Sequence, residues 1–243
     1  LPIEADMTQI ITKDEIGTLS VEAINARIED AFSYDEYAWQ KEKGIRITEP
    51  FRAEGLHKIL YQCPYCEKEH TMTSTGATLS CRSCGATTLL HEDGSLETTG
   101  QETRFTHVPD WYEWERENVR KEVMSGTYAF EDDVRIDWLP NAKGYIDLGK
   151  GHIRHDKDGF VLTGTDQHGQ PFELRRPVLS MYGLHVEYDY FKKGDCIDLS
   201  TTDDTYYIYP LNRTDVVTKL SLATEELYKI ERFREITQAD KRP

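Results

Sequence analysis

The chain has 243 residues and a formal net charge of −15, with 38% hydrophobic residues that include 14 tyrosines, 8 phenylalanines and 4 tryptophans. These side chains are enough to build packed cores and exclude wholesale disorder, and the length predicts two or three compact units. The acidic charge is spread along the chain, so nucleic acid and bare anionic lipid surfaces are disfavoured as main partners.

A membrane-spanning helix needs about 18 to 20 apolar residues in a row, and no stretch of the sequence approaches this length. The N-terminus also lacks the charged and apolar regions of a signal peptide. We therefore expect a soluble protein in the cytoplasm. The sequence starts at Leu1 and Pro2 without an initiator methionine, which predicts that it is an internal or processed part of a longer protein.

Residues 1–50 are predicted to be a helical linker or adaptor. Ser20 can cap a first helix, because apolar residues follow it at spacings of three and four. These residues are Ile24, Ile28 and Ala31 or Phe32. Ser33 and Glu36 have the spacing of a capping box for a second helix, and Gly44 is its predicted end.

Residues 51–108 contain two cysteine pairs of C-x2-C spacing. The pairs are Cys63 with Cys66 and Cys81 with Cys84, and 14 residues separate them. Two residues between ligands allow a tight turn that directs both sulfurs at one ion, and four thiolates suit the tetrahedral preference of Zn2+. We predict a zinc ribbon in which these four cysteines hold a structural Zn2+.

Neighbouring residues support this prediction. Pro64 stiffens the first turn, Gly85 can adopt a positive φ after the second, and the Thr-rich segment between the pairs is interrupted at Gly76, which predicts a hairpin. Disulfides are a less suitable interpretation, because the chain has an odd fifth cysteine and no secretion signal. An iron site of the rubredoxin type uses cysteine spacing similar to that of a zinc ribbon and stays open as an alternative. Four protein ligands leave no open coordination position, so hydrolysis at this metal is not expected.

Three further residues could take part in metal chemistry or nucleophilic catalysis. His70 and His91 flank the cysteine pairs and could replace a ligand, but four cysteines already suffice, so both are predicted to be surface histidines. Cys196 lies in GDCIDLS, an alternating stretch typical of a strand. We expect a small buried side chain there and not a nucleophile.

Residues 109–126 are predicted to form a connecting helix that ends at Gly126. Oppositely charged residues recur at helical spacing. They are Glu113 with Arg116, and Glu117 with Arg120 and Lys121. Trp111 and Trp114 share a face of this helix; they could hold a ligand, but packing between the ribbon and its neighbour is the favoured interpretation.

Residues 127–230 change to a period of two, which predicts six or seven short antiparallel strands. The alternating apolar residues are Val134, Ile136, Trp138, Phe172, Leu174, Val186, Tyr188, Tyr190, Ile197, Leu199, Tyr206 and Ile208. Turn sequences separate the strands: KDG (157–159), QHGQP (167–171), KKGD (192–195) and TTDDT (201–205).

A helical period returns after Asp215, and one apolar stripe follows. Its members are Val216, Leu220, Ala223, Leu227 and Ile230. The predicted fold class is α+β: N-terminal helices, a four-cysteine zinc ribbon, and a small antiparallel β barrel or sandwich closed by a C-terminal helix. This layout is similar to pleckstrin-homology-like domains, as an analogy of fold that says little about a ligand. Residues 231–243 are predicted to be a frayed tail.

Catalytic patterns are absent from the sequence: it has no G-x-x-x-x-G-K-[ST], H-E-x-x-H or G-x-S-x-G. Residues 149–155, GKGHIRH, could meet a phosphate through Lys150, His152, Arg154 and His155, but a solvated hairpin is favoured. Paired carboxylates occur at Asp132 with Asp133 and at Asp203 with Asp204, where we expect turns or loops. No catalytic set is predicted.

Four segments together resemble a known family. They are HKILYQCPYCEKEH, CRSCGATTLLHEDGSLE, TRFTHVPDWYEWERENVRKEV and KLSLATEELYKI. They resemble the C-terminal extension of bacterial 1-acyl-sn-glycerol-3-phosphate acyltransferases, members of the phospholipid/glycerol acyltransferase family. The segment DEIGTLSVEAINARIEDAFSYDEYAWQKEKGIRI is similar to the stretch that joins the catalytic domain of that family to its extension.

The family's catalytic domain carries H-x4-D, in which the histidine is the general base. No histidine of this chain is followed by aspartate at that spacing, so only the four cysteines can be carried over from the resemblance. The resemblance implies a structural, docking or regulatory region of an enzyme that acylates lysophosphatidic acid. Its partner would be the catalytic domain of the same parent chain, with peripheral association at the inner membrane face through that domain.

The alternative is a free-standing interaction module, in which a zinc ribbon and a pleckstrin-homology-like domain bind a protein or a lipid head group. Nucleic-acid binding by the ribbon is disfavoured, because acidic residues outnumber basic ones within residues 51–108.

Overall fold

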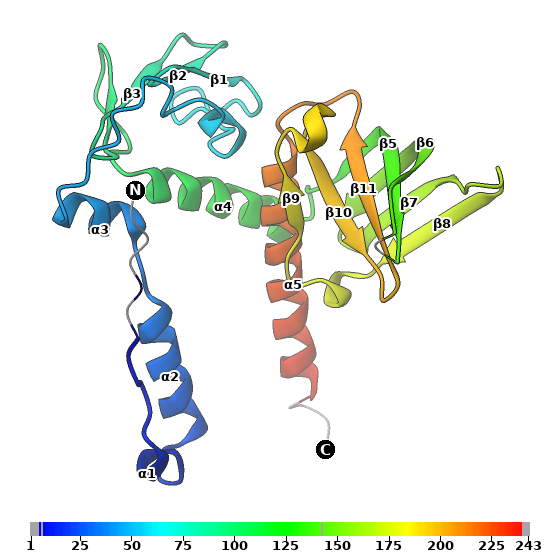
Figure 1. Ribbon diagram of the computed structural model, residues 1–243, viewed down its shortest axis with the longest axis horizontal. Helices are drawn as coiled ribbons and strands as arrows, with labels where there is room; N and C mark the ends of the chain where they lie inside the picture. The colour runs from blue at the N-terminus through cyan, green and yellow to red at the C-terminus, as the bar shows by residue number, and fades with distance from the viewer. Residues whose placement is uncertain (1–4, 6, 142, 240–243) are drawn as a thin grey trace. The chain divides into compact units, whose positions relative to one another are not determined.

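The computed structural model describes residues 5, 7–141 and 143–239, and the chain divides into two compact units, residues 1–46 and 47–243 (Figure 1). The first unit is helical in its described part. The second contains two antiparallel sheets and two long helices. The predicted α+β class is confirmed at this level. Among the helices of the described residues, none combines the length and hydrophobicity that crossing a membrane requires.

The first unit has three short helices, α1 (Lys13–Ile16), α2 (Val21–Phe32) and α3 (Glu36–Glu42). Ser20 caps α2 as predicted, because its side chain accepts a hydrogen bond from the Ala23 N–H. The predicted capping box at Ser33 is wrong. The carboxylate of Asp35 accepts from the Ala38 N–H and caps α3, while Ser33 follows the last residue of α2. Aspartate caps helices as well as serine does. In α3 the cap is Asp35, two residues after the predicted Ser33.

The ribbon, predicted at residues 51–108, lies near the start of the second unit. After a 3-10 turn, η1 (Leu56–Lys58), four strands follow in the spatial order β1-β2-β3-β4. They are β1 (Met72–Thr75), β2 (Thr78–Cys81), β3 (Thr87–Leu90) and β4 (Leu96–Thr98). The predicted hairpin between the cysteine pairs is confirmed, because Met72 pairs with Cys81 and Thr75 with Thr78 around a turn at Gly76.

The connecting helix α4 (Val108–Ser125) follows the ribbon and ends as predicted at Gly126, whose φ is 73° and whose N–H donates to carbonyls of the last turn. Its two tryptophans contact the ring of Phe105, with centroid distances of 6.1 Å for Trp111 and 5.7 Å for Trp114. Trp111 is only 1% exposed. These are packing contacts, which agrees with the favoured interpretation.

A seven-stranded antiparallel sheet forms the rest of the second unit, in the order β8-β7-β6-β5-β11-β10-β9. Its strands are β5 (Phe130–Pro140), β6 (Ile146–Asp156), β7 (Gly159–Thr165), β8 (Pro171–Arg176), β9 (His185–Glu187), β10 (Cys196–Ser200) and β11 (Asp204–Pro210). Two meanders, β5 to β8 and β9 to β11, join where β11 pairs with β5.

The predicted barrel is not formed, because β8 and β9 are the two edges of the sheet and do not pair with each other in the described residues (Figure 1). To close the sheet into a barrel, β8 and β9 would have to pair with each other along their length. β9 has only three residues, and Pro177, which has no N–H to donate, follows β8. The chain then forms η2 (Val178–Ser180), and after β9 it forms η3 (Tyr190–Lys192), where a longer strand was expected.

The C-terminal helix α5 (Val217–Ala239) packs against the sheet and α4. Its predicted apolar stripe is buried at Val216, Leu220, Ala223 and Leu227, and these residues share one core with both neighbours. Members from the sheet are Val134, Ile136, Ile153, Leu162, Ile197, Leu199 and Ile208, and Val119 comes from α4. The helix continues to Ala239, past Ile230, so residues 231–239 are helical and not the predicted frayed tail.

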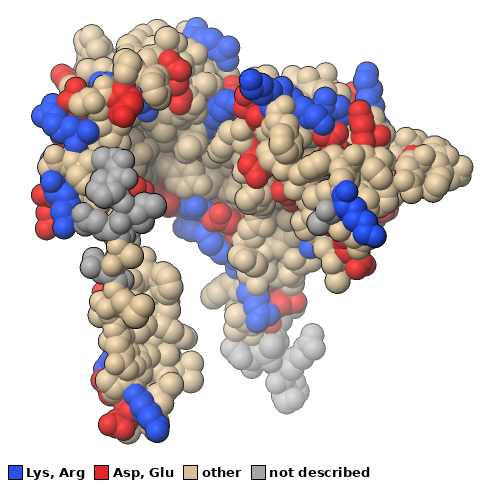
Figure 2. Space-filling view, in the orientation of Figure 1, with Lys and Arg blue, Asp and Glu red and all other residues tan. Residues whose placement is uncertain are grey.

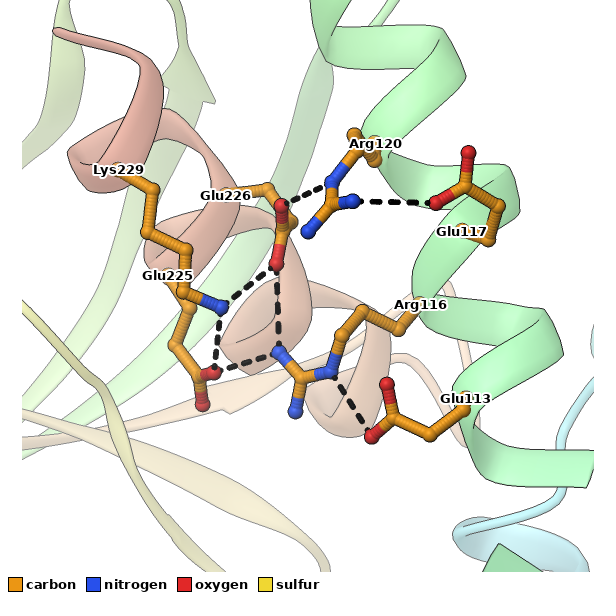
Figure 3. Close-up of polar contacts among 7 residues, drawn as sticks. All are labelled: Glu113, Arg116, Glu117, Arg120, Glu225, Glu226 and Lys229. Carbon is orange, nitrogen blue, oxygen red and sulfur yellow. Dashed lines mark hydrogen bonds and ion pairs between the residues drawn. The ribbon is translucent and has the colours of Figure 1, made fainter. Parts of the chain in front are cut away.

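Charged residues fasten α5 to α4, and the buried Glu226 is central to them (Figure 3). Its carboxylate accepts from Arg120 Nε at 2.8 Å, from Lys229 Nζ at 2.9 Å and from Arg116 Nη1 at 3.5 Å. Burial alone would raise the pKa of Glu226, but the hydrogen bonds from Lys229 and Arg120 outweigh it and lower the pKa.

We predict that Glu226→Gln destabilises the protein at pH 7 by about 1–3 kcal/mol, because it removes a buried charged acceptor from two partly buried arginines and one exposed lysine. A lowered pKa stabilises the fold above about pH 4.5, and this contribution is lost as the pH falls below that value. The difference between the two proteins should therefore shrink toward pH 3. Urea unfolding at both pH values measures it.

The matched control is Glu231→Gln on the same helix, since Glu231 pairs with Arg234 at 3.2 Å and both side chains are about half exposed. Exposed pairs contribute about 0–1 kcal/mol. Equal effects of the two substitutions would contradict a special role for Glu226.

Candidate metal centre

The four predicted cysteines converge in the ribbon. Their sulfur atoms all lie within 4.8 Å of one another. The Sγ atoms of Cys63 and Cys84 are 3.6 Å apart, and those of Cys66 and Cys81 are 3.7 Å apart. A tetrahedral ion with metal–sulfur bonds of about 2.3 Å requires sulfur–sulfur distances of about 3.8 Å. The four cysteines are therefore positioned to bind a metal ion.

The sulfur–sulfur distances also test whether the cysteines form disulfides or bind a metal ion. A disulfide has a sulfur–sulfur distance of about 2.05 Å, and all five cysteines of this chain are free thiols. The disulfide alternative is not supported. Zn2+ and the iron of a rubredoxin-type site both accept a tetrahedron of thiolates, so the geometry is compatible with zinc and the identity of the ion stays a prediction.

Two similar backbone turns present the sulfurs. In each turn, the N–H four residues after the first cysteine donates to the carbonyl of that cysteine, at 2.9 Å in both. The N–H of the same cysteine donates to the carbonyl five residues further on, at 3.0 Å for Cys63 and 2.9 Å for Cys81. The repeated pattern shows that the two C-x2-C pairs fold by the same local rule.

Each turn needs one residue with positive φ. Gly85 fills this position in the second turn with φ 78°, as predicted, and Glu67 fills it in the first with φ 58°. The left-handed conformation costs a residue with a Cβ about 1–2 kcal/mol. Sequence reasoning missed Glu67, because only glycine signals this conformation reliably. We therefore expect the first turn to depend more on its tertiary contacts and on metal binding than the second turn does.

The thiols of the cluster differ in acidity. Burial raises the pKa of Cys63 to about 12. Burial also acts to raise the pKa of Cys81, but hydrogen bonds from the Thr71 hydroxyl at 3.3 Å and the Ser83 N–H at 3.4 Å help to lower it to about 6. Metals bind cysteine as thiolate, so a bound cation would compensate for the unfavourable ionisation of Cys63.

The residue before the first cysteine is held by α4. Gln62 donates its N–H to Glu115 Oε1 at 2.7 Å, and its carbonyl accepts from Trp111 Nε1 at 3.0 Å. Its side-chain oxygen accepts from Asn118 Nδ2 at 2.9 Å, and its side-chain nitrogen donates to the Glu67 carbonyl at 2.8 Å. Gln62 therefore connects the first metal-binding turn directly to α4. We call these contacts the Gln62 clamp.

Glu115 is the most unusual member of the Gln62 clamp, since it is fully buried. Burial raises its pKa well above the usual value, although the hydrogen bond from the Gln62 N–H acts in the opposite direction. Its second oxygen, Oε2, has no hydrogen-bond partner in the described residues. Both observations favour a neutral carboxyl that serves as an acceptor.

The ribbon also contacts α5. Lys219 donates to Glu69 of the ribbon at 2.8 Å and to Glu122 of α4 at 2.9 Å. His70 Nδ1 lies 3.0 Å from the carbonyl oxygen of Asp215, just before α5, and its ring stacks on Tyr61 at a centroid distance of 5.2 Å. His70 is therefore a half-buried packing residue, with 28% of its side chain exposed, and it lies outside the cysteine cluster as expected.

Other residues that the sequence singled out lie outside the cysteine cluster. His91 pairs with Glu97 at 2.8 Å near the surface, in agreement with the prediction. Cys196 is fully buried in β10, also as predicted. Asp132 is a correction, because it lies buried in β5 instead of in a turn. Its carboxylate accepts from the Asn212 side chain at 2.8 Å and from two backbone N–H groups.

The segment 149–155 lies in β6, in the middle of the sheet. Lys150, His152 and Arg154 are exposed, but His155 is only 1% exposed, so the predicted solvated hairpin is wrong for this residue. Its ring stacks on Phe160 at 3.7 Å, and burial lowers its pKa to about 3. A neutral histidine of this kind is a core residue and offers no cation to a phosphate.

Comparisons of the chain with protein-family models, with curated proteins and with solved structures found no match. The resemblance to the acyltransferase extension therefore stays a prediction.

Two substitutions test the Gln62 clamp. We predict that Glu115→Leu destabilises the zinc-loaded protein by about 1–3 kcal/mol, because the buried Gln62 N–H loses its acceptor. Glu115→Gln keeps an acceptor oxygen and should cost clearly less. Urea unfolding of both variants at pH 7 measures the difference.

The pH dependence provides a second readout for Glu115. A carboxyl whose pKa is raised by folding keeps its proton in the native state while the unfolded chain loses it, so its contribution to stability falls as the pH rises above about 4.5. Glu115→Gln should remove this decline relative to the parent protein, whose metal site is the same. Identical pH slopes, together with equal losses for Gln and Leu, would contradict a neutral Glu115.

Proposed function

We propose that this chain is an accessory region, without catalytic residues of its own, in which a structural Zn2+ holds a ribbon that docks on α4 and α5. The observation that carries the proposal is the tetrahedral spacing of the four cysteine sulfurs together with the Gln62 clamp. Four protein ligands complete the shell of the ion, which is typical of structural zinc and not of catalytic zinc. The metal would then stabilise the position of the ribbon on the two helices.

We propose further that this region belongs to a glycerophospholipid acyltransferase that acylates lysophosphatidic acid. This step rests on the resemblance of the four sequence segments alone. In such an enzyme the ribbon and the large sheet would position or regulate a catalytic domain that carries H-x4-D. That domain would bring the chain to the inner membrane face.

A free-standing interaction module is the second candidate. The open sheet favours it, because β8 and β9 both present unpaired edges while α5 covers one face. A pleckstrin-homology-like arrangement of sheet and C-terminal helix belongs to this proposal, with a protein or lipid head group as ligand. Acidic and basic side chains are interspersed over the face that Figure 2 shows, which supports the expectation that nucleic acid is not the partner.

The zinc proposal predicts one zinc ion per chain after exhaustive dialysis against metal-free buffer, measured by elemental analysis. Cys66→Ser and Cys84→Ser should lose that ion, while the control Cys196→Ser should keep it. Hydrogen exchange should show loss of protection across residues 60–100 in the metal-free protein, since structural zinc contributes about 10 kcal/mol or more to the folding of small modules. Iron in place of zinc, or less than one metal ion per chain, would refute this assignment.

The acyltransferase proposal predicts no turnover of lysophosphatidic acid with acyl-CoA by these 243 residues alone. It also predicts that the gene encodes an H-x4-D domain upstream of Leu1. A start codon close to Leu1 would favour the interaction module instead. Acyl transfer by the isolated chain would contradict the assignment of this region as accessory.

A further inference from the structure

A second group of metal-ligating side chains lies on the large sheet, at its β9 edge. It consists of His185 and Glu187 on β9 and Asp198 on β10, strands that lie side by side (Figure 1). His185 and Glu187 are two residues apart on one strand, so they project from the same face. Asp198 is the direct partner of His185 across the antiparallel pair. Pairing in the sheet therefore brings all three side chains together.

The distances within this group suit one cation. His185 Nε2 lies 3.1 Å from Glu187 Oε1 and 4.0 Å from Asp198 Oδ2, and the three ligand atoms all fall within 4.8 Å. An octahedral ion with bonds of about 2.1 Å separates its ligand atoms by about 3.0 Å for neighbours and about 4.2 Å for opposite positions. Both distances from the histidine fall in this range.

Asp198 provides an independent reason to expect a cation. Its side chain is 10% exposed. The oxygen 4.0 Å from His185 is Oδ2, and the other oxygen, Oδ1, is buried without a hydrogen-bond partner in the described residues. The ion pairs in the described residues give it no lysine or arginine, and its only basic neighbour there is the exposed His185 at 4.0 Å. Buried carboxylates are normally paired, hydrogen-bonded or bound to a metal, because an isolated buried charge is costly.

We propose that His185, Glu187 and Asp198 form a second metal site, for a divalent first-row transition-metal ion. One imidazole and two carboxylates are ligands that suit Mn2+ and Zn2+, whereas the four thiolates of the ribbon strongly favour softer ions. Three protein ligands leave coordination positions open, and the edge of the sheet exposes them to solvent. This site therefore differs from the ribbon in both ligand chemistry and access.

Mn2+ is the probe that separates the two sites. The full chain carrying one equivalent of zinc after exhaustive dialysis is titrated with Mn2+ at moderate salt, and the free ion is followed by its electron paramagnetic resonance signal. We expect one equivalent of Mn2+ to bind, with an affinity that falls about tenfold or more in His185→Ala and in Asp198→Asn, since loss of a ligand should cost at least as much as loss of an outer-shell partner. Zinc content and circular dichroism should remain unchanged in both variants.

The matched control is Glu173→Gln on β8, at the opposite edge of the sheet, where the carboxylate pairs with Arg175 at 2.6 Å and both side chains are largely exposed. This substitution removes the same charge, so it reports attraction of Mn2+ by the acidic surface in general. Affinity should stay at the parent value. Equal affinity in the parent protein and in the double variant His185→Ala with Asp198→Asn would overturn the proposal, as would equal losses in Glu173→Gln and Asp198→Asn. The result is independent of the four-cysteine site.

Discussion

Four cysteine sulfurs within 4.8 Å of one another are positioned to bind one metal ion, and in the proposed zinc-bound state this ion would neutralise them as thiolates. Their mutual repulsion and the burial of Cys63 both oppose ionisation in the absence of a metal. A bound ion reverses both effects and closes two turns at once, including the one that places Glu67 in a conformation that glycine prefers. The four short strands bury Met72, Leu79, Leu90 and Leu96, and in the proposed zinc-bound state the ion would add to the stability that this packing gives.

The effect of this centre extends beyond the ribbon, because the chain is attached to it at Gln62. Three side chains of α4 contact that single residue, about one turn apart on the same helical face. α4 meets α5 through Val119, one turn after Glu115 on the same face, and through Arg116 and Arg120, which pair with Glu226. Helix α5 in turn packs on the large sheet. Metal site, helices and sheet thus form one continuous packing arrangement.

The two proposed metal sites differ in ligand chemistry and in what the ion would do for the fold. The ribbon surrounds its ion with four protein sulfurs, so the metal contributes to folding and has no position for a substrate. The group at the β9 edge has three ligands on strands that are already paired, so the fold does not require the ion to form. Without the metal, the carboxylate of Asp198 would have no cation bound to it, whereas the backbone hydrogen bonds between β9 and β10 would remain.

Local signals in the sequence were sufficient for the cysteine cluster, the hairpin at Gly76, the cap at Ser20 and the end of α4 at Gly126. Each depends on residues within a few positions of one another, where turn geometry and helix capping dominate. Other features depend on residues far apart. The buried Glu115 looks like an ordinary helix-surface residue until Gln62 is placed beside it. His155 alternates with exposed residues, and its burial becomes clear only when Phe160 and Tyr128 surround it.

The sequence by itself therefore determined the clustering of the four cysteines, the main elements and the α+β class, because these follow from spacing and periodicity. Only the tertiary structure decided that the large sheet stays open, that α4 holds the first metal-binding turn, and that Asp198 lies beside His185 and Glu187. Each of these depends on which strands and helices become neighbours. That choice is made by the burial of a shared apolar core and by backbone pairing between distant segments, neither of which leaves a short-range pattern in the chain.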